Sequence, residues 1–372
     1  MTELTRREAL GAAAAATALL VPGSALAASP GLDAIGRQRG VRFGTCLGAR
    51  GFQDSRYRAL IADQCGLIVP ENELKWQVLR PDAKTFDFAR ADALITWAKS
   101  VGLATRGHTL LWQKTERYPK WLIEHDFGTN PGAEAERLLT EHVTTVAGRY
   151  AGILPSFDVV NEAVDEDTGA LRETVLTTAL GAETVIDLAF RTARAAAPDM
   201  QLVYNDYMSW EPGNELHCCG VLKLLEALKK RGTPVDALGV QSHIGAPGRA
   251  RSAPFGARDE KAWRGFLDEA TGMGLKLLVT EMDVNDKLLP GDIPSRDRSV
   301  ADYARAFLDV MLSYPQLDTV LFWGLADQYS WLQGLTPRPD GLPKRCLPYG
   351  ADYAPKPLRA AVATALGAAP SR

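Results

Sequence analysis

Two glutamates that follow short apolar segments are the residues of this sequence best placed to do chemistry. Glu162 comes after the run Phe157 to Val160 and Asn161, and Glu281 lies in the second half of the run Lys276 to Val284. Runs of this length and composition are typical of buried strands. Cleavage of a glycosidic bond requires two facing carboxyl groups, one protonated and one ionised. We therefore interpret Glu162 and Glu281 as candidates for such a pair.

The neighbouring residues suggest how the two carboxyl groups divide the work. Side chains two positions apart on a strand point to the same side, so Asp283 faces the same way as Glu281, and His243 the same way as Gln241. A chain from Asp283 through His243 would orient Glu281 and keep it ionised, as a nucleophile requires. Glu162 would then be held protonated by the nearby negative charge and act as the acid and base. A retaining enzyme places the two carboxyl groups about 5 to 5.5 Å apart.

Other apolar runs also end in polar or aromatic side chains, which are costly to bury without a purpose. Asn161 stands beside Glu162, where it could bind a sugar 2-hydroxyl. A buried ion-pair network without activity is the structural alternative. The number of apolar runs that end in polar or aromatic side chains favours a single functional site instead. The groups at these ends include Glu71, Asn72, Lys75, His108, Trp112, Tyr207, Gln241, Trp323 and Trp331.

The sequence lacks the residue patterns that metal-dependent or serine-nucleophile catalysis requires. The five histidines are scattered, so no compact metal-ligand set is visible, and we expect no metal and no cofactor. A Gly-x-Ser-x-Gly turn is absent, which argues against a serine nucleophile of that type. A bound calcium ion held by loop carboxylates stays open.

The elements that would position these residues alternate along the chain. Eight strand-length runs lead into helical patterns, which predicts parallel pairing and a single (β/α)8 barrel, an α/β fold with its functional groups at the C-terminal ends of the strands. An open doubly wound sheet would require a Gly-rich turn after the first strand, and the segment from Cys46 to Gly51 does not match it. The runs are Arg42 to Leu47, Leu67 to Val69, Leu103 to Leu111, Phe157 to Val160, Gln201 to Tyr204, Ala237 to His243, Lys276 to Val284 and Thr319 to Trp323.

The N-terminus has the pattern of an export signal. Arg6 and Arg7 precede an Ala-rich apolar run, and Ala25-Leu26-Ala27 matches a cleavage site. The run is too short for a membrane anchor, because Pro22 and Gly23 end it. We expect a twin-arginine-type signal over residues 1–27, a catalytic domain over residues 28–372, and a periplasmic or extracellular protein.

Charge and cysteine content limit the partners. The net charge of −3 gives no electrostatic reason to expect nucleic acid or a membrane as a partner, and we expect a monomer. Five cysteines without CxxC spacing do not form a disulfide framework. We expect Cys46 and Cys65 to be buried, whereas the state of Cys218 and Cys219 stays open.

Three motifs make the sequence resemble glycoside hydrolase family 10 from about Arg42 to Tyr353. They are Glu71-Asn72-Glu73-Leu74-Lys75-Trp76, Phe157-Asp158-Val159-Val160-Asn161-Glu162-Ala163 and Val279-Thr280-Glu281-Met282-Asp283-Val284. His108-Thr109-Leu110-Leu111-Trp112 lies between the first two, and Trp323-Gly324, Asp327 and Ser330-Trp331 follow the third.

This resemblance implies a retaining endo-1,4-β-xylanase with Glu162 as acid/base and Glu281 as nucleophile. It places Tyr207 on the leaving-group side and makes Lys75 and Trp331 the residues to watch for substrate choice, because a bulky ring would crowd the hydroxymethyl group of glucose. The sequence departs from the family pattern at Gln113, Met282 and Cys46. The implied xylose-binding positions are Glu71, Asn72, Lys75, His108, Trp112, Asn161, Gln241, His243, Trp323 and Trp331.

Two other functions fit parts of the pattern. Another β-1,4-glucanase, such as a cellulase, would share the two carboxyl groups. A non-catalytic polysaccharide-binding protein would share the cleft, but such proteins usually lose one carboxylate. Xylan or xylo-oligosaccharides are therefore the expected substrates.

Overall fold

The computed structural model describes residues 30–245, 253–335 and 337–372. The export signal expected over residues 1–27 lies outside these ranges. Within them, no helix has both the length and the apolar character needed to cross a membrane.

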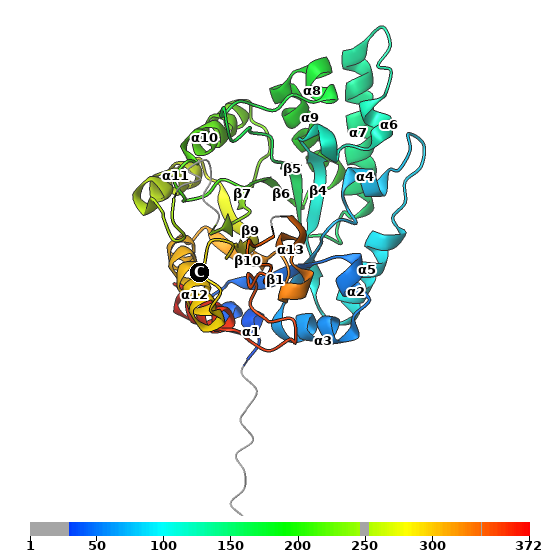
Figure 1. Ribbon diagram of the computed structural model, residues 1–372. Coiled ribbons are helices and arrows are strands. Elements are labelled where there is room, and N and C mark those ends of the chain that lie inside the picture. The colour runs from blue at the N-terminus through cyan, green and yellow to red at the C-terminus, as the bar shows by residue number, and fades with distance from the viewer. Residues whose placement is uncertain (1–29, 246–252, 336) are drawn as a thin grey trace, which may run out of the picture. The chain divides into compact units, whose positions relative to one another are not determined.

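The parallel strands of the body formed by residues 31–372 surround a central axis, with the helices outside them (Figure 1). The order of the main sheet is β3-β2-β1-β10-β9-β7-β6-β5-β4, and β8 pairs with β9. β3 and β4 stand at opposite ends of this order, yet only Arg106 separates them in the chain, so the sheet closes on itself. The predicted (β/α)8 barrel is therefore confirmed. The strands are β1 (Arg42–Leu47), β2 (Leu67–Pro70), β3 (Ala104–Thr105), β4 (Gly107–Trp112), β5 (Ser156–Asn161), β6 (Gln201–Asp206), β7 (Ala237–Val240), β8 (His243–Ile244), β9 (Lys276–Val284) and β10 (Leu317–Phe322).

The helices follow the strands and turn one apolar stripe towards the sheet. In α9 the buried residues Val185, Ile186, Ala189, Phe190 and Ala193 recur at helical spacing. The α-helices are α1 (Leu32–Arg37), α2 (Ala49–Phe52), α3 (Ser55–Gln64), α4 (Trp76–Leu79), α5 (Ala89–Ser100), α6 (Lys120–Ile123), α7 (Pro131–Arg149), α8 (Val175–Leu180), α9 (Ala182–Ala196), α10 (Glu215–Lys230), α11 (Glu260–Gly272), α12 (Ile293–Leu312), α13 (Leu332–Leu335) and α14 (Pro357–Ala368), with 3-10 turns η1 (Thr115–Arg117) and η2 (Asp327–Tyr329).

The predicted strands differ from the observed ones chiefly at two breaks. The run Leu103 to Leu111 is divided at Arg106, and the run Ala237 to His243 is divided at Gln241 and Ser242. Ser242 adopts a left-handed backbone with φ of 65°, which interrupts the strand. Strand β9 has its full predicted length and carries Glu281 and Asp283 in its C-terminal half.

Candidate active site

One cleft at the C-terminal ends of the strands collects the predicted site residues. It has a volume of about 510 Å³, and every predicted catalytic and substrate-binding residue lines it. Asp283 is not part of the lining, because it lies fully buried behind His243. The predicted lining residues are Glu71, Asn72, Lys75, His108, Trp112, Asn161, Glu162, Tyr207, Gln241, His243, Glu281, Trp323 and Trp331, and the cleft adds Lys114, Arg117, Glu166 and Leu335.

The two glutamates come from different strands and are both nearly buried. Glu162 directly follows β5, and Glu281 lies within β9; their exposed fractions are 6% and 5%. The backbone of Glu162 is left-handed, with φ of 54°. A residue with a Cβ rarely adopts this conformation without a functional reason.

The carboxylate of Glu281 is held from three sides. Asn205 Nδ2 donates a hydrogen bond of 2.7 Å to Oε1, and His243 Nε2 lies 3.4 Å from Oε2. His108 Nδ1 lies farther away, at 3.9 Å from Oε1. These contacts fix the direction of both oxygens before any substrate binds.

His243 joins Glu281 to a second carboxylate, as the sequence predicted. Its Nδ1 lies 3.0 Å from Asp283 Oδ2, which also accepts a 2.7 Å hydrogen bond from Trp331 Nε1. Burial lowers the pKa of His243, but the charges and hydrogen bonds of Asp283 and Glu281 outweigh it and raise the pKa to about 10. The imidazolium of His243 therefore hydrogen-bonds to Asp283 through Nδ1 and forms an ion pair with Glu281 through Nε2.

Glu162 has a different environment. Gln241 Nε2 donates a 3.0 Å hydrogen bond to Oε1, and the ammonium of Lys114 forms an ion pair with Oε2. Burial raises the pKa of Glu162, but the charge and hydrogen bond of Lys114 outweigh it, so the pKa lies below its ordinary value. The direction of this shift is opposite to the one expected for Glu162 from the sequence, because Lys114 favours the carboxylate.

Three side-chain amides connect the two carboxyl groups. The amide of Asn161 lies 2.9 Å from that of Asn205 and 3.2 Å from that of Gln241. Asn205 contacts Glu281 at one end of this row, and Gln241 contacts Glu162 at the other. The row ties the positions of the two carboxyl groups to each other.

A buried ion pair supports the floor of the cleft. Arg106 Nη1 donates a 2.8 Å hydrogen bond to Asp158 Oδ2, and a second Arg106 nitrogen pairs with the other carboxylate oxygen. His108 Nδ1 lies 2.9 Å from Asp158 Oδ2. Asp158 thereby orients the ring of His108, which forms a T-shaped pair with the ring of Trp323.

The far wall of the cleft combines cations with an aromatic ring. Lys75 Nζ donates a 2.9 Å hydrogen bond to Asn72 Oδ1 and lies 4.8 Å from the centre of the Trp112 ring. The guanidinium carbon of Arg117 lies 4.6 Å from the same ring centre. Burial lowers the pKa of Lys75 and raises that of Glu71, its neighbour in the cleft.

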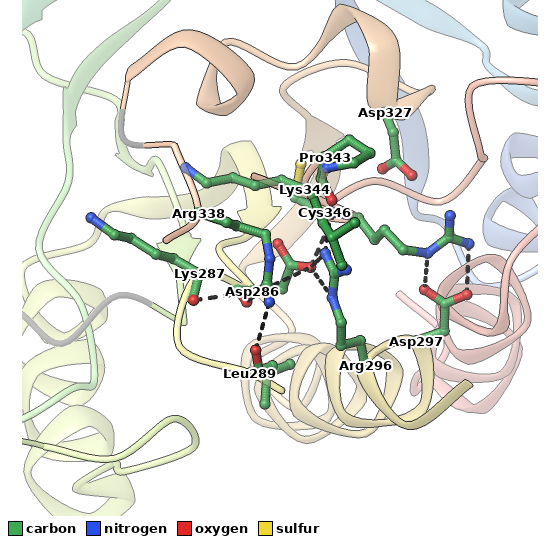
Figure 2. A network of polar contacts seen from close by, with 12 residues as sticks. Asp286, Lys287, Leu289, Arg296, Asp297, Asp327, Arg338, Pro343, Lys344 and Cys346 are labelled. Carbon is green, nitrogen blue, oxygen red and sulfur yellow. Dashed lines mark hydrogen bonds and ion pairs between the residues drawn. The ribbon is translucent and has the colours of Figure 1, made fainter. Parts of the chain in front are cut away.

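A second polar network, shown in Figure 2, lies between the segment after β9, helix α12 and the segment around Arg338 and Lys344. Arg296 Nε on α12 donates a 2.9 Å hydrogen bond to Asp286, just past β9, and Arg338 Nη2 donates to the carbonyl of Leu289 at 2.8 Å. Arg345 forms two hydrogen bonds with Asp297, of 2.6 and 2.7 Å. Residues Arg338 and Arg345 are thereby fixed to the segment that follows β9 and to α12.

The departures from the family pattern have separate outcomes. Gln113 is buried, its Oε1 accepts a 2.6 Å hydrogen bond from Tyr118, and it does not line the cleft. Cys46 and Cys65 are buried as expected, whereas Cys218 is half-buried and Cys219 exposed.

Two residues that contact the carboxyl groups were not among the predicted site residues. Asn205 directly follows the expected strand Gln201 to Tyr204, and the alternation of side chains could have pointed to it. Lys114 lies in a loop, where spacing gives no such signal. Among the described residues, no group of three or more His, Cys, Asp or Glu side chains is arranged to hold a metal ion.

Comparison with known proteins agrees with this geometry. Residues 31–365 match the model of glycosyl hydrolase family 10. Endo-1,4-beta-xylanase 5 of Pyricularia oryzae is 30% identical over 346 residues, which cover 91% of this chain and 79% of that protein. The structure of xylanase 10B from Thermotoga petrophila RKU-1 in complex with xylobiose is similar at 28% identity, with a TM-score of 0.80 and coverage of 91% of this chain and 97% of that one. Native xylanase 10B from Thermotoga maritima gives a TM-score of 0.79 at 28% identity, covering 90% of this chain and 98% of that one. The chain thus belongs to glycosyl hydrolase family 10.

Proposed function

We propose that the protein is an endo-1,4-β-xylanase that cleaves internal bonds of xylan with retention of configuration. The observation that carries the proposal is the joining of two unlike carboxyl groups in one cleft by a row of amides. Family membership, relatives named as xylanases and a solved relative bound to xylobiose support the substrate.

Glu281 serves as the nucleophile. The imidazolium of His243 and the amide of Asn205 hold its two oxygens in a fixed direction. It attacks the anomeric carbon and forms a covalent glycosyl-enzyme.

Glu162 serves as the acid and then as the base. It gives its proton to the departing sugar oxygen, and once Glu281 is esterified it takes a proton from the attacking water. Asn161, one residue before it, binds the 2-hydroxyl of the sugar being cleaved. Tyr207 lines the cleft beside Lys114, and we assign its ring to the leaving-group side.

The opposite side of the cleft binds the rest of the xylose chain. Glu71, Asn72 and Lys75 supply hydrogen bonds there, and Trp323 and Trp331 supply apolar faces. Trp331 is 37% exposed and projects into the cleft while its Nε1 is held by Asp283. A ring fixed in this way would crowd a hydroxymethyl group, which favours xylose over glucose.

The test is an assay of the protein on xylan and on carboxymethyl-cellulose. Glu281→Ala and Glu162→Ala would run beside it, with azide as an external nucleophile. We expect xylan cleavage to be lost in both variants. An α-configured glycosyl azide should form with Glu281→Ala, and a β-configured one with Glu162→Ala on substrates with an activated leaving group.

Other results would favour the other functions. Cleavage of the glucan alone would keep the mechanism and replace the substrate. Binding of both polymers without cleavage of either, or of xylo-oligosaccharides, would indicate a non-catalytic binding protein. We also propose that residues 1–27 direct export of the protein and are then removed. The mass of the protein recovered outside the cytoplasm of a producing cell would test this, because it should lack these residues.

A further inference from the structure

The ammonium of Lys114 lies in the cleft beside Glu162 and Tyr207, and no step of the proposed reaction requires a cation there. It pairs with Oε2 of Glu162 and lies 4.7 Å from the centre of the Tyr207 ring. One cation therefore covers both the proton-donating group and the aromatic ring assigned to the leaving sugar.

The backbone of Lys114 is fixed, but its side chain can move. The Lys114 N–H donates a 2.9 Å hydrogen bond to the carbonyl of Trp112, and its own carbonyl accepts one of 2.9 Å from Arg117 in the following 3-10 turn. The side chain is 22% exposed and has a flexible four-carbon stem, so it can swing into solvent without disturbing the loop.

The other charged groups around Glu162 do not replace Lys114. Across residues 30–245, 253–335 and 337–372, it is the one cation within ion-pair distance of the Glu162 carboxylate. Arg172 is directed elsewhere, to Asp165 at 2.9 Å and to the Tyr207 hydroxyl at 2.7 Å. The remaining titratable groups facing this part of the cleft are Glu166, Asp206 with its partner His217, Tyr204, His243 and Glu281.

The two contacts of Lys114 oppose the first step of the reaction. A general acid must carry a proton, whereas an adjacent ammonium stabilises the carboxylate. A sugar stacked on Tyr207 would also need the space that the ammonium holds.

We propose that Lys114 is a positioning residue that occupies the leaving-group side of the cleft in the free protein and is displaced from Glu162 and Tyr207 by the incoming sugar. The proposal rests on the proposed function. Its consequence is that the charge state of Glu162 differs between the free protein and the substrate complex.

The pH dependence of the reaction separates these two states. The basic limb of kcat/KM reports the acid group in the free enzyme, and that of kcat reports it in the substrate complex. With an unactivated xylo-oligosaccharide, we expect Lys114→Met to move the basic limb of kcat/KM upwards by about 1 to 3 pH units, the range for loss of an adjacent opposite charge. The basic limb of kcat should stay within about 0.3 units, a margin small against that range.

Two variants serve as controls. Lys114→Arg keeps the cation and should keep the wild-type limb. Lys120→Gln removes a lysine of the next helix that is 85% exposed and pairs only at the surface with Glu124, at 3.5 Å, so it should change neither limb. Movement of both limbs in Lys114→Met would show that the cation stays in place with substrate bound, and movement of neither would show that it does not act on Glu162; each overturns the proposal.

Failure of the proposed function would look different. If wild-type protein cleaves xylan and Glu162→Ala loses activity on unactivated substrates but keeps it on aryl glycosides with acidic leaving groups, Glu162 is the acid whatever Lys114 does. A wild-type protein inactive on all xylo-oligosaccharides would refute the proposed function, and the premise of the Lys114 proposal with it.

Discussion

Replacing Asn205 with alanine should slow the attack of Glu281 on the sugar. Asn205 is fully buried, and its Nδ2 donates the 2.7 Å hydrogen bond to Glu281 Oε1. Its Oδ1 accepts a 2.7 Å hydrogen bond from Thr280 Oγ1, which fixes the amide in the orientation that points Nδ2 at the carboxylate. No other amide contacts this oxygen among the described residues.

The size of the effect follows from the type of hydrogen bond. A hydrogen bond to a charged group contributes about 1.5 to 3 kcal/mol. Since about 1.4 kcal/mol corresponds to a factor of ten in rate, the kcat/KM of Asn205→Ala should fall about 10- to 150-fold. An aryl xylobioside is the suitable substrate, because its leaving group needs no proton from Glu162 and the measurement reports the nucleophilic step.

Thr280→Val provides the matched control, since it removes the support of the Asn205 amide but leaves the donor to Glu281. A neutral hydrogen bond contributes about 1 kcal/mol, so its loss should be about fivefold. Thermal melting of both variants checks that they are folded. A folded Asn205→Ala enzyme within about threefold of wild type, a change worth only about 0.7 kcal/mol, would refute the role given to this hydrogen bond.

Three other perturbations test the site. Single replacements in the buried pair, Asp158→Leu or Arg106→Met, should each lower the free energy of unfolding by about 3 to 5 kcal/mol, while the double variant should lose clearly less than their sum; additive losses in denaturant titrations would contradict the pairing. Trp331→Ala should raise the ratio of glucan to xylan kcat/KM by about tenfold or more, as removing steric crowding at one substituent does, and an unchanged ratio would show that the ring does not select xylose. His243 contributes stability that is fully present below about pH 6.5, its ordinary pKa, and is lost as the pH rises to its pKa of about 10 in the folded protein. The melting temperature of wild type should therefore exceed that of His243→Asn most near pH 6 and progressively less towards pH 10, and a gap that does not change with pH would refute a charged His243.

Much of the site could be predicted because it depends on local rules. Strand-length apolar runs identify the strand ends, and the two-residue alternation identifies the residues that face the cleft. Glu281, His243 and Asp283 were placed together on these grounds, and their contacts are those predicted.

The remaining features depend on contacts between distant segments. Lys114 meets Glu162 only because the loop after β4 lies over the end of β5, and nothing in the local sequence encodes that contact. The break at Ser242 is equally hidden, since a serine does not by itself predict a left-handed backbone. The pKa of Glu162 is shifted in the direction opposite to the expected one for the same reason, because the charge of Lys114 comes from another loop.

The left-handed backbone at Glu162 creates a conflict between catalytic activity and thermal stability. This conformation costs a residue with a side chain of order 1 to 3 kcal/mol, whereas glycine adopts it at little cost. Glu162→Gly should therefore melt at a higher temperature than the active protein, provided that the lost contacts with Gln241 and Lys114 cost less than the strain. A library of variants selected for heat resistance alone would then become enriched in inactive proteins. Thermostability engineering of this enzyme therefore needs an activity screen from the first round.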